Sequence, residues 1–194
     1  MAAQTPKGNM PVVVLKDDAS QVKGREAQKN NIAAAKIIAE IVHTSLGPKG
    51  MDKMLVDSLG DVTITNDGAT ILKEIDVQHP AAKMLVEISK TTDNEVGDGT
   101  TSAVVLAGAL LEHAEALVLQ DVHPTIIVDG YRKAGRKAKE FLDQIAENVS
   151  ATDNGVLLKI AKTSMQTKLV RKDSEQLADM IVKAVKAVAE NNGN

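Results

Sequence analysis

The chain has 194 residues, a net charge of −3 and no cysteine, and its only aromatic residues are Tyr131 and Phe141. The missing cysteines exclude disulfides, thiol catalysis and cysteine-ligated metals, and the charge and aromatic content argue against nucleic-acid binding by a basic face or by stacking. A core of aliphatic residues favours closely packed helices over an aromatic-rich β-sandwich.

The first part of the chain predicts a strand, a long helix and a β-hairpin. The β-branched run over residues 12–15 predicts a short strand that needs a partner, which another chain could supply. Apolar residues recur at helical spacing over 20–44, and Pro48 with its flanking glycines ends that helix. An apolar run over 54–56 and a β-branched run over 62–65 flank a turn and predict the hairpin.

Most of the remaining chain is predicted to be helical. We expect helices over residues 69–75, 80–92, 102–120, 124–147, 156–163 and 174–190. The polar break at 150–153 predicts a domain boundary there.

The sequence favours a cytoplasmic protein without a membrane partner. The first residues contain no apolar signal core. The longest unbroken apolar run, 103–111, ends at Glu112 and is too short to span a bilayer.

The most informative motif is Gly97-Asp98-Gly99-Thr100-Thr101-Ser102, which lies between two predicted helices. The glycines allow close approach to a ligand, and the hydroxyl residues open a helix whose first amides attract anions. Asp98 would repel a phosphate unless a divalent cation lay between them. The motif therefore indicates a nucleotide with Mg²⁺. The alternative is that Asp98 is an ordinary helix cap.

Two further glycine-containing loops, around Gly47 and Gly68, could converge with this motif on one phosphate chain. In the first loop, Lys49 or Lys53 could supply positive charge; alternatively, Gly47 is simply a left-handed helix C-cap. In the second loop, Asp67 could orient or deprotonate a water that attacks a terminal phosphate, or it could cap the next helix.

The three loops resemble the group II chaperonins, the family of the archaeal thermosome and the eukaryotic cytosolic chaperonin. The matching stretches are 46–54, 65–72 and 97–102, and the resemblance runs from about residue 12 to about residue 190. It implies a mainly α fold: the N-terminal part of an equatorial domain over 1–150, followed by the start of an intermediate hinge domain over 151–194. The apical domain and the C-terminal part of the equatorial domain would be absent.

The same resemblance implies roles for individual residues. Asp67 would be catalytic, positioning the attacking water, and Asp98 would hold Mg²⁺. The residues expected to contact ATP or ADP are Leu46, Gly47, Pro48, Gly99, Thr100, Thr101, Ser102, Gln166, Thr167 and Lys168.

The implied function is that of an ATP-dependent molecular chaperone. Its subunits would form a homo- or hetero-oligomeric double ring, hydrolyse ATP with Mg²⁺, and assist the folding of unfolded polypeptides. Two alternatives stay open: a structural or assembly fragment without ATP turnover of its own, and a helical binding module whose three loops are only helix caps.

Overall fold

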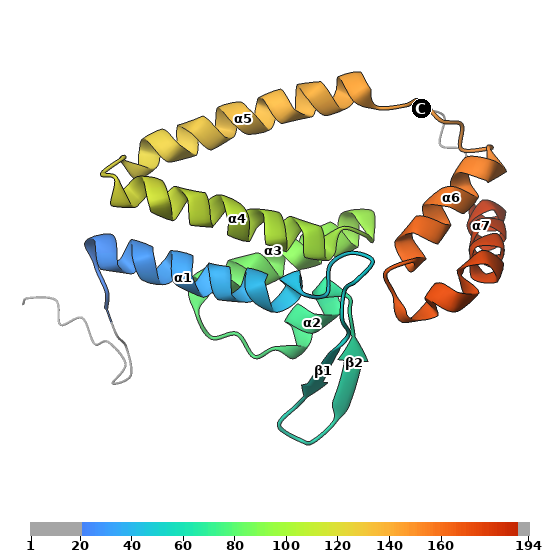
Figure 1. Cartoon of the computed structure of the whole chain (residues 1–194), viewed down its shortest axis with the longest axis horizontal. Coiled ribbons are helices and arrows are strands. Elements are labelled where there is room, and N and C mark those ends of the chain that lie inside the picture. The colour runs from blue at the N-terminus through green and yellow to red at the C-terminus, as the bar shows by residue number, and fades with distance from the viewer. Residues whose placement is uncertain (1–20, 190–194) are drawn as a thin grey trace, which may run out of the picture.

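The computed structural model describes residues 21–189, and helices dominate this part of the chain (Figure 1). The elements in chain order are α1 (Gly24–His43), β1 (Lys53–Val56), β2 (Val62–Thr65), α2 (Gly68–Glu74), α3 (Pro80–Val96), α4 (Thr100–Leu119), α5 (Pro124–Ile145), α6 (Asn154–Met165), the 3₁₀ helix η1 (Leu169–Asp173) and α7 (Ser174–Val188). The mainly α fold is confirmed. The strand predicted over residues 12–15 lies outside the described residues.

The core lies between α1, α3 and α4, which run side by side in Figure 1, and α2 packs against α3. Its buried side chains are small or aliphatic: Ala35, Ile38, Ala39, Val42, Ile71, Leu72, Ala82, Leu85, Val86 and Val104. The apolar stripe predicted over residues 20–44 is the buried face of α1, and α4 buries a stripe that contains Val104, Gly108 and Ala114. These stripes hold the helices together because each removes apolar surface from water.

Helices α1 and α4 approach closely where Gly108 faces Ala39. A Cβ atom added to Gly108 would lie 2.2 Å from the Cβ of Ala39, so only glycine allows this separation. At the rim of the same interface, the Lys36 ammonium donates to a Glu115 carboxylate oxygen at 3.0 Å. This hydrogen bond raises the pKa of Lys36 above its ordinary value.

The hairpin joins β1 and β2 antiparallel, from the pair Lys53 and Thr65 to the pair Val56 and Val62. It extends away from the helices in Figure 1. The predicted turn between the strands is therefore confirmed, and β2 leads directly into the residues that begin α2.

Two predicted boundaries differ by four residues from the structure: α1 begins at Gly24 rather than near residue 20, and α3 ends at Val96 rather than near residue 92. Threonine, aspartate and asparagine are weak helix formers, so the segment before Gly97 suggested an earlier end. The actual stop is Gly97, which has a φ of 74° and donates its N–H to the carbonyls of Thr92 and Asp93.

Helix α4 extends beyond the unbroken apolar run that was judged too short for a bilayer. In the described part of the chain it is the one helix whose length and composition would allow it to cross a membrane. Only 17% of that apolar window is buried in this structure. Here Val104 and Gly108 are buried, and the helix packs on α1 and α3.

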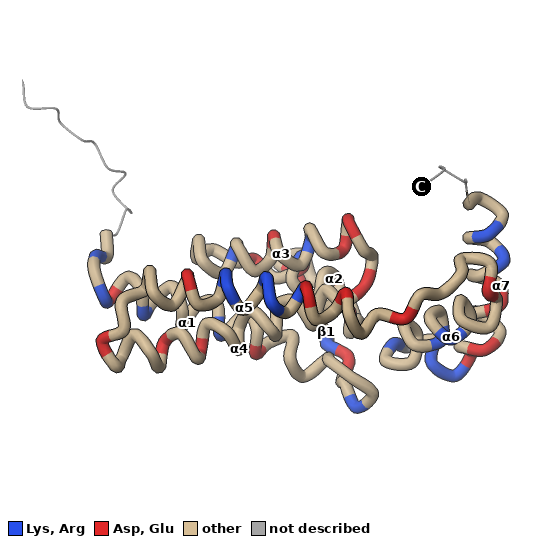
Figure 2. The backbone as a smooth tube through the Cα atoms, turned by 90° about the horizontal axis from the view of Figure 1, so that it is seen from above, with Lys and Arg blue, Asp and Glu red and all other residues tan. Residues whose placement is uncertain are grey.

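Helix α5 turns back from α4 and diverges from it in Figure 1. The Tyr131 hydroxyl donates to the carbonyl of Leu110 at 2.6 Å and joins the first half of α5 to the middle of α4. Further along α5, Phe141, Leu142 and Ile145 are exposed. Basic and acidic residues are interspersed along the helices in Figure 2.

We predict that Gly108→Ala lowers the free energy of unfolding by about 1–3 kcal/mol, because the new methyl group overlaps Ala39. Urea unfolding measures this change. The matched control is Gly130→Ala in α5, where nothing lies within 4 Å of the added Cβ. That variant should gain up to about 1 kcal/mol from helix propensity. Equal effects at the two glycines would contradict the close packing of α1 and α4.

Candidate functional site

One small cavity gathers the three glycine-containing loops. Its volume is about 70 Å³, which suits a phosphate-sized group rather than a whole nucleotide. The lining residues are Ser45, Leu46, Gly47, Asn66, Asp67, Asp98, Gly99, Thr100, Thr101, Ser102, Thr167 and Lys168. Segments more than a hundred residues apart in the sequence therefore meet at one place, at the ends of α1, β2 and α6 and at the beginning of α4.

The beginning of α4 presents backbone amides to this cavity. Its N-cap is Gly99, which has a φ of 80° and provides no side chain to accept from the first turn. Asp98 does not cap the helix either, because its Oδ1 accepts from the N–H of Gly99 at 2.8 Å. An uncapped helix N-terminus of this kind is suited to an anion.

Asp67 is the N-cap of α2, as the structural alternative predicted. Its Oδ2 accepts from the N–H of Thr70 at 3.0 Å and from the Thr70 hydroxyl at 2.9 Å. The same residue also lines the cavity. Capping therefore fixes the position of this carboxylate, and the two roles proposed for Asp67 are compatible.

Gly68 brings the beginnings of α2 and α4 together. A Cβ atom on Gly68 would lie 2.4 Å from the Oγ1 of Thr101 and 2.9 Å from its Cα. Both residues are buried. Because of this contact, Asp67 and the first turn of α4 face the same cavity.

The loop after α1 contradicts the interpretation of Gly47 as the C-cap of that helix. Helix α1 ends at His43 with Thr44 as its C-cap, and Gly47, with a φ of 84°, comes three residues later. The buried Ser45 donates its hydroxyl to the carbonyl of Val42 at 2.7 Å. The loop therefore turns back across the end of the helix, toward the cavity.

The positive charge at the cavity comes from Lys168. Neither Lys49 nor Lys53 is among the lining residues, contrary to the expectation that one of them would serve. The ammonium of Lys53 instead donates to the hydroxyl of Thr44. The N–H of Lys168 donates to the carbonyl of the buried Met165 at 3.0 Å, which anchors the lysine to the end of α6.

Ten of the twelve residues expected at the site line the cavity, and Pro48 and Gln166 do not. Both are exposed. Two lining residues, Ser45 and Asn66, were not predicted. The Asn66 side-chain amide donates to the main-chain carbonyl of Thr167.

The carboxylates fit a magnesium ion bound together with a phosphate chain. In the described residues no group of three or more Asp, Glu or His side chains could hold a metal alone. Mg²⁺ in nucleotide sites is usually held by one or two carboxylates plus substrate phosphates. Asp98 and Asp67, both in the cavity lining, could supply those carboxylates.

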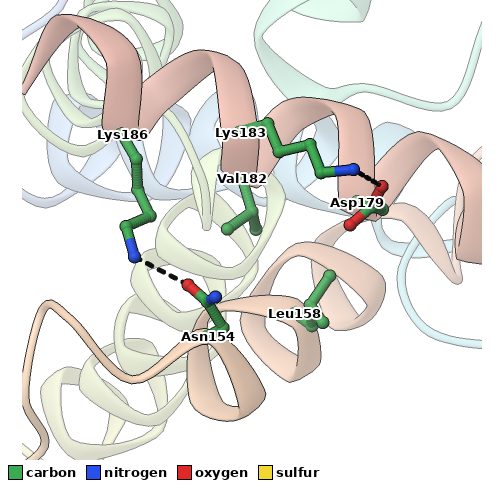
Figure 3. Close-up of a pocket in the computed structure, with 6 residues that line it drawn as sticks. All are labelled: Asn154, Leu158, Asp179, Val182, Lys183 and Lys186. Carbon is green, nitrogen blue, oxygen red and sulfur yellow. Dashed lines mark hydrogen bonds and ion pairs between the residues drawn. The ribbon is translucent and has the colours of Figure 1, made fainter.

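A second cavity, of about 270 Å³, lies between α6 and α7 (Figure 3). Its polar groups satisfy one another: Lys183 pairs with Asp179 at 2.6 Å, and Lys186 donates to the Oδ1 of Asn154 at 2.7 Å. This cavity therefore resembles an internal helix contact more than an anion site.

The chain matches the TCP-1/cpn60 chaperonin family over residues 38–194. It is 57% identical over 185 residues to the thermosome subunit beta of Methanothermobacter thermautotrophicus, which covers 95% of this chain and 34% of that protein. It is 58% identical over 180 residues to the thermosome subunit alpha of Archaeoglobus fulgidus, covering 93% and 33%. The chain thus spans about a third of the length of these curated relatives. The chain belongs to the TCP-1/cpn60 chaperonin family.

We predict that Gly68→Ala disturbs the first turn of α4 in particular, because the added methyl group must displace the backbone of Thr101. Amide hydrogen exchange should accelerate over residues 101–104 and change little in α5. The same substitution at Gly135, where the added Cβ has no neighbour within 4 Å, is the control. Unchanged exchange at the beginning of α4 would contradict the contact between the two helices.

Proposed function

We propose, from its membership of the chaperonin family, that this chain is the nucleotide-binding part of an ATP-dependent chaperone subunit. The observation that carries the proposal is the cavity where the uncapped beginning of α4, the carboxylates of Asp67 and Asp98, and the cation of Lys168 meet. Within this proposal, residues 1–150 are equatorial and 151–194 begin the intermediate domain.

The phosphates of ATP or ADP occupy the cavity in this proposal. The amides and hydroxyls of Thr100, Thr101 and Ser102 donate to phosphate oxygens, and Gly99 and Gly47 allow the backbone to approach them. The cavity is far smaller than the roughly 300–1,000 Å³ pockets that enclose drug-sized ligands. The nucleoside therefore extends outside it, along the exposed loop that contains Leu46 and Pro48.

Asp67 and Asp98 have different proposed roles. Asp98 coordinates Mg²⁺, which neutralises charge on the phosphates during transfer to water. Asp67 accepts a hydrogen bond from the attacking water and orients it toward the terminal phosphate. The α2 cap supports this role because it fixes the carboxylate through Thr70.

At the level of the whole subunit we propose a double ring that uses ATP hydrolysis to assist the folding of unfolded polypeptides in the cytoplasm. Two relatives are named as thermosome subunits alpha and beta, which supports assembly with like subunits. Binding of unfolded polypeptide would belong to parts of the subunit beyond this sequence.

A second candidate is an assembly role without ATP turnover in the isolated chain. Large apolar side chains are exposed on several helices, among them Met84 and Val96 on α3 and Leu119 on α4. Surfaces of this kind usually mark contacts with other protein. If Mg-ADP did not change the melting temperature of the purified chain, only the assembly role would remain.

We predict that Mg-ADP raises the melting temperature of the chain, since a ligand at 100 times its Kd adds about 2.7 kcal/mol of stability. Asp98→Ala should lose most of this shift. Removing Mg²⁺ with EDTA should lower the shift in the parent chain but barely change it in the variant. Asp143→Ala, an exposed carboxylate on α5, is the control. Equal shifts of the melting temperature in Asp98→Ala and Asp143→Ala would contradict the proposed role of Asp98 in binding.

We predict that Asp67→Asn keeps the N-cap of α2 but removes the carboxylate proposed to orient the attacking water. Asparagine caps helices as well as aspartate does, so folding and nucleotide affinity should be retained. ATP turnover by rings assembled from subunits that carry this sequence should fall by about 10²–10⁴-fold, the usual contribution of a general base. Turnover at the parental rate would exclude the proposed role of Asp67.

A further inference from the structure

The first turn of α6 begins with an asparagine followed by a glycine, Asn154 and Gly155. In a flexible chain such a pair is chemically labile, because glycine has no side chain to shield its main-chain nitrogen from the side-chain amide that precedes it. The sequence contains one other pair of this kind, at 192–193, which lies outside the described residues. The labile pair in the described part of the chain therefore stands directly after the polar break at 150–153.

The reaction open to this pair is deamidation, which needs only water. The nitrogen of Gly155 loses its proton and attacks the Cγ of Asn154. The bond between Cγ and Nδ2 breaks, ammonia leaves, and a succinimide ring closes. Water then opens the ring to aspartate or isoaspartate, with no change of oxidation state. Either product carries a carboxylate in place of a neutral amide, and isoaspartate also lengthens the main chain.

The structure holds the attacking nitrogen in the N-cap of α6. The N–H of Gly155 donates to the Oδ1 of Asp153 at 2.8 Å, and the same oxygen accepts from the N–H of Val156 at 3.3 Å. A proton held by a carboxylate is harder to remove, so the nitrogen stays unreactive while the cap is closed. A Cβ atom on residue 155 would lie only 3.2 Å from this oxygen. The close cap therefore favours the very glycine that makes the pair labile.

The amide that would be attacked is restrained as well. The Oδ1 of Asn154 accepts from the ammonium of Lys186 at 2.7 Å, across the gap between α6 and α7 (Figure 3). This contact opposes the side-chain rotation that would bring Cγ onto the nitrogen of Gly155. Asn154, Gly155 and Lys186 are all exposed, so water reaches the pair as soon as these contacts open.

We propose that Asn154 is a latent deamidation site, which the Asp153 cap keeps closed and which reacts when the first turn of α6 opens. Residues 146–153 form no helix or strand, so no preceding element holds this turn. Helix ends open locally at a lower cost in free energy than the core does. The inference is independent of the nucleotide site. It makes Asn154 a place where the chain gains a negative charge with age.

The test follows deamidation of the full chain in mildly alkaline buffer by tryptic digestion and mass spectrometry. The peptide 140–159 lies between Lys139 and Lys159 and contains both Asn148 and Asn154, so its fragment ions assign the reaction to one asparagine or the other. Asn154 in the folded parent should react about tenfold or more slowly than in the same chain unfolded in urea, because the first turn must open first. Equal rates in the folded and unfolded chain would overturn the proposal.

Asp153→Ala removes the acceptor of the cap and should accelerate the reaction at Asn154 by about five- to tenfold, the change in the open population that the loss of a helix cap causes. Asp153→Ser is the matched control, because serine caps helices about as well as aspartate, and it should react at nearly the parental rate. Hydrogen exchange of the α7 amides establishes that the α6–α7 pair stays folded in both variants. An unchanged rate in Asp153→Ala, or equal acceleration by serine and alanine, would show that the cap does not protect the site.

Lys186→Met tests the second restraint without touching the cap. Freed from the ammonium, Asn154 should deamidate faster than in the parent, by less than in Asp153→Ala. A slower reaction would mean that the lysine activates the carbonyl, and would overturn its proposed restraining role. Preferential reaction at Asn148 in Asp153→Ala would contradict the assignment of the site to Asn154.

Discussion

The site depends on the absence of a side chain at Gly68. The backbone of Thr101 lies where a Cβ of residue 68 would be, so the beginnings of α2 and α4 touch. Two of the features that face the cavity follow from this contact: the capping carboxylate of Asp67 on one side and the open amides after Gly99 on the other. A larger residue at position 68 would separate the carboxylate from the helix end without altering either one locally.

The aliphatic core also helps to form the cavity, through the packing of α1 against α4. With almost no aromatic residues, α1 and α4 can pack at the close distance set by Gly108 and Ala39. Close packing aligns the helices so that the end of α1 lies next to the beginning of α4. The loop that follows α1, which contains Ser45 and Gly47, then reaches the cavity. The composition that excluded an aromatic-rich sandwich thus also explains why loops so distant in the sequence converge.

Helix positions and glycine loops could be predicted from the sequence because each depends on local chemistry: apolar periodicity, proline and left-handed turns. The interpretation of Gly47 as a C-cap was wrong because α1 ends at His43, four residues before it, and Thr44 is its C-cap. Asn66 could not have been identified in this way. Its significance comes from a carbonyl 101 residues further along the chain, and no local pattern encodes that contact. Lys49 and Lys53 looked equally suitable as cations, but neither lines the cavity, and the ammonium of Lys53 bonds the hydroxyl of Thr44 instead.

The tyrosine that ties α5 to α4 has a practical consequence. Tyr131 is the only tyrosine in a chain without tryptophan, so nearly all the intrinsic ultraviolet emission of the protein originates from one ring. That ring sits where its hydroxyl meets the carbonyl of Leu110. Tyrosine fluorescence is therefore a local optical probe of the contact between α4 and α5, and no aromatic side chain lines the phosphate-sized cavity at the beginning of α4.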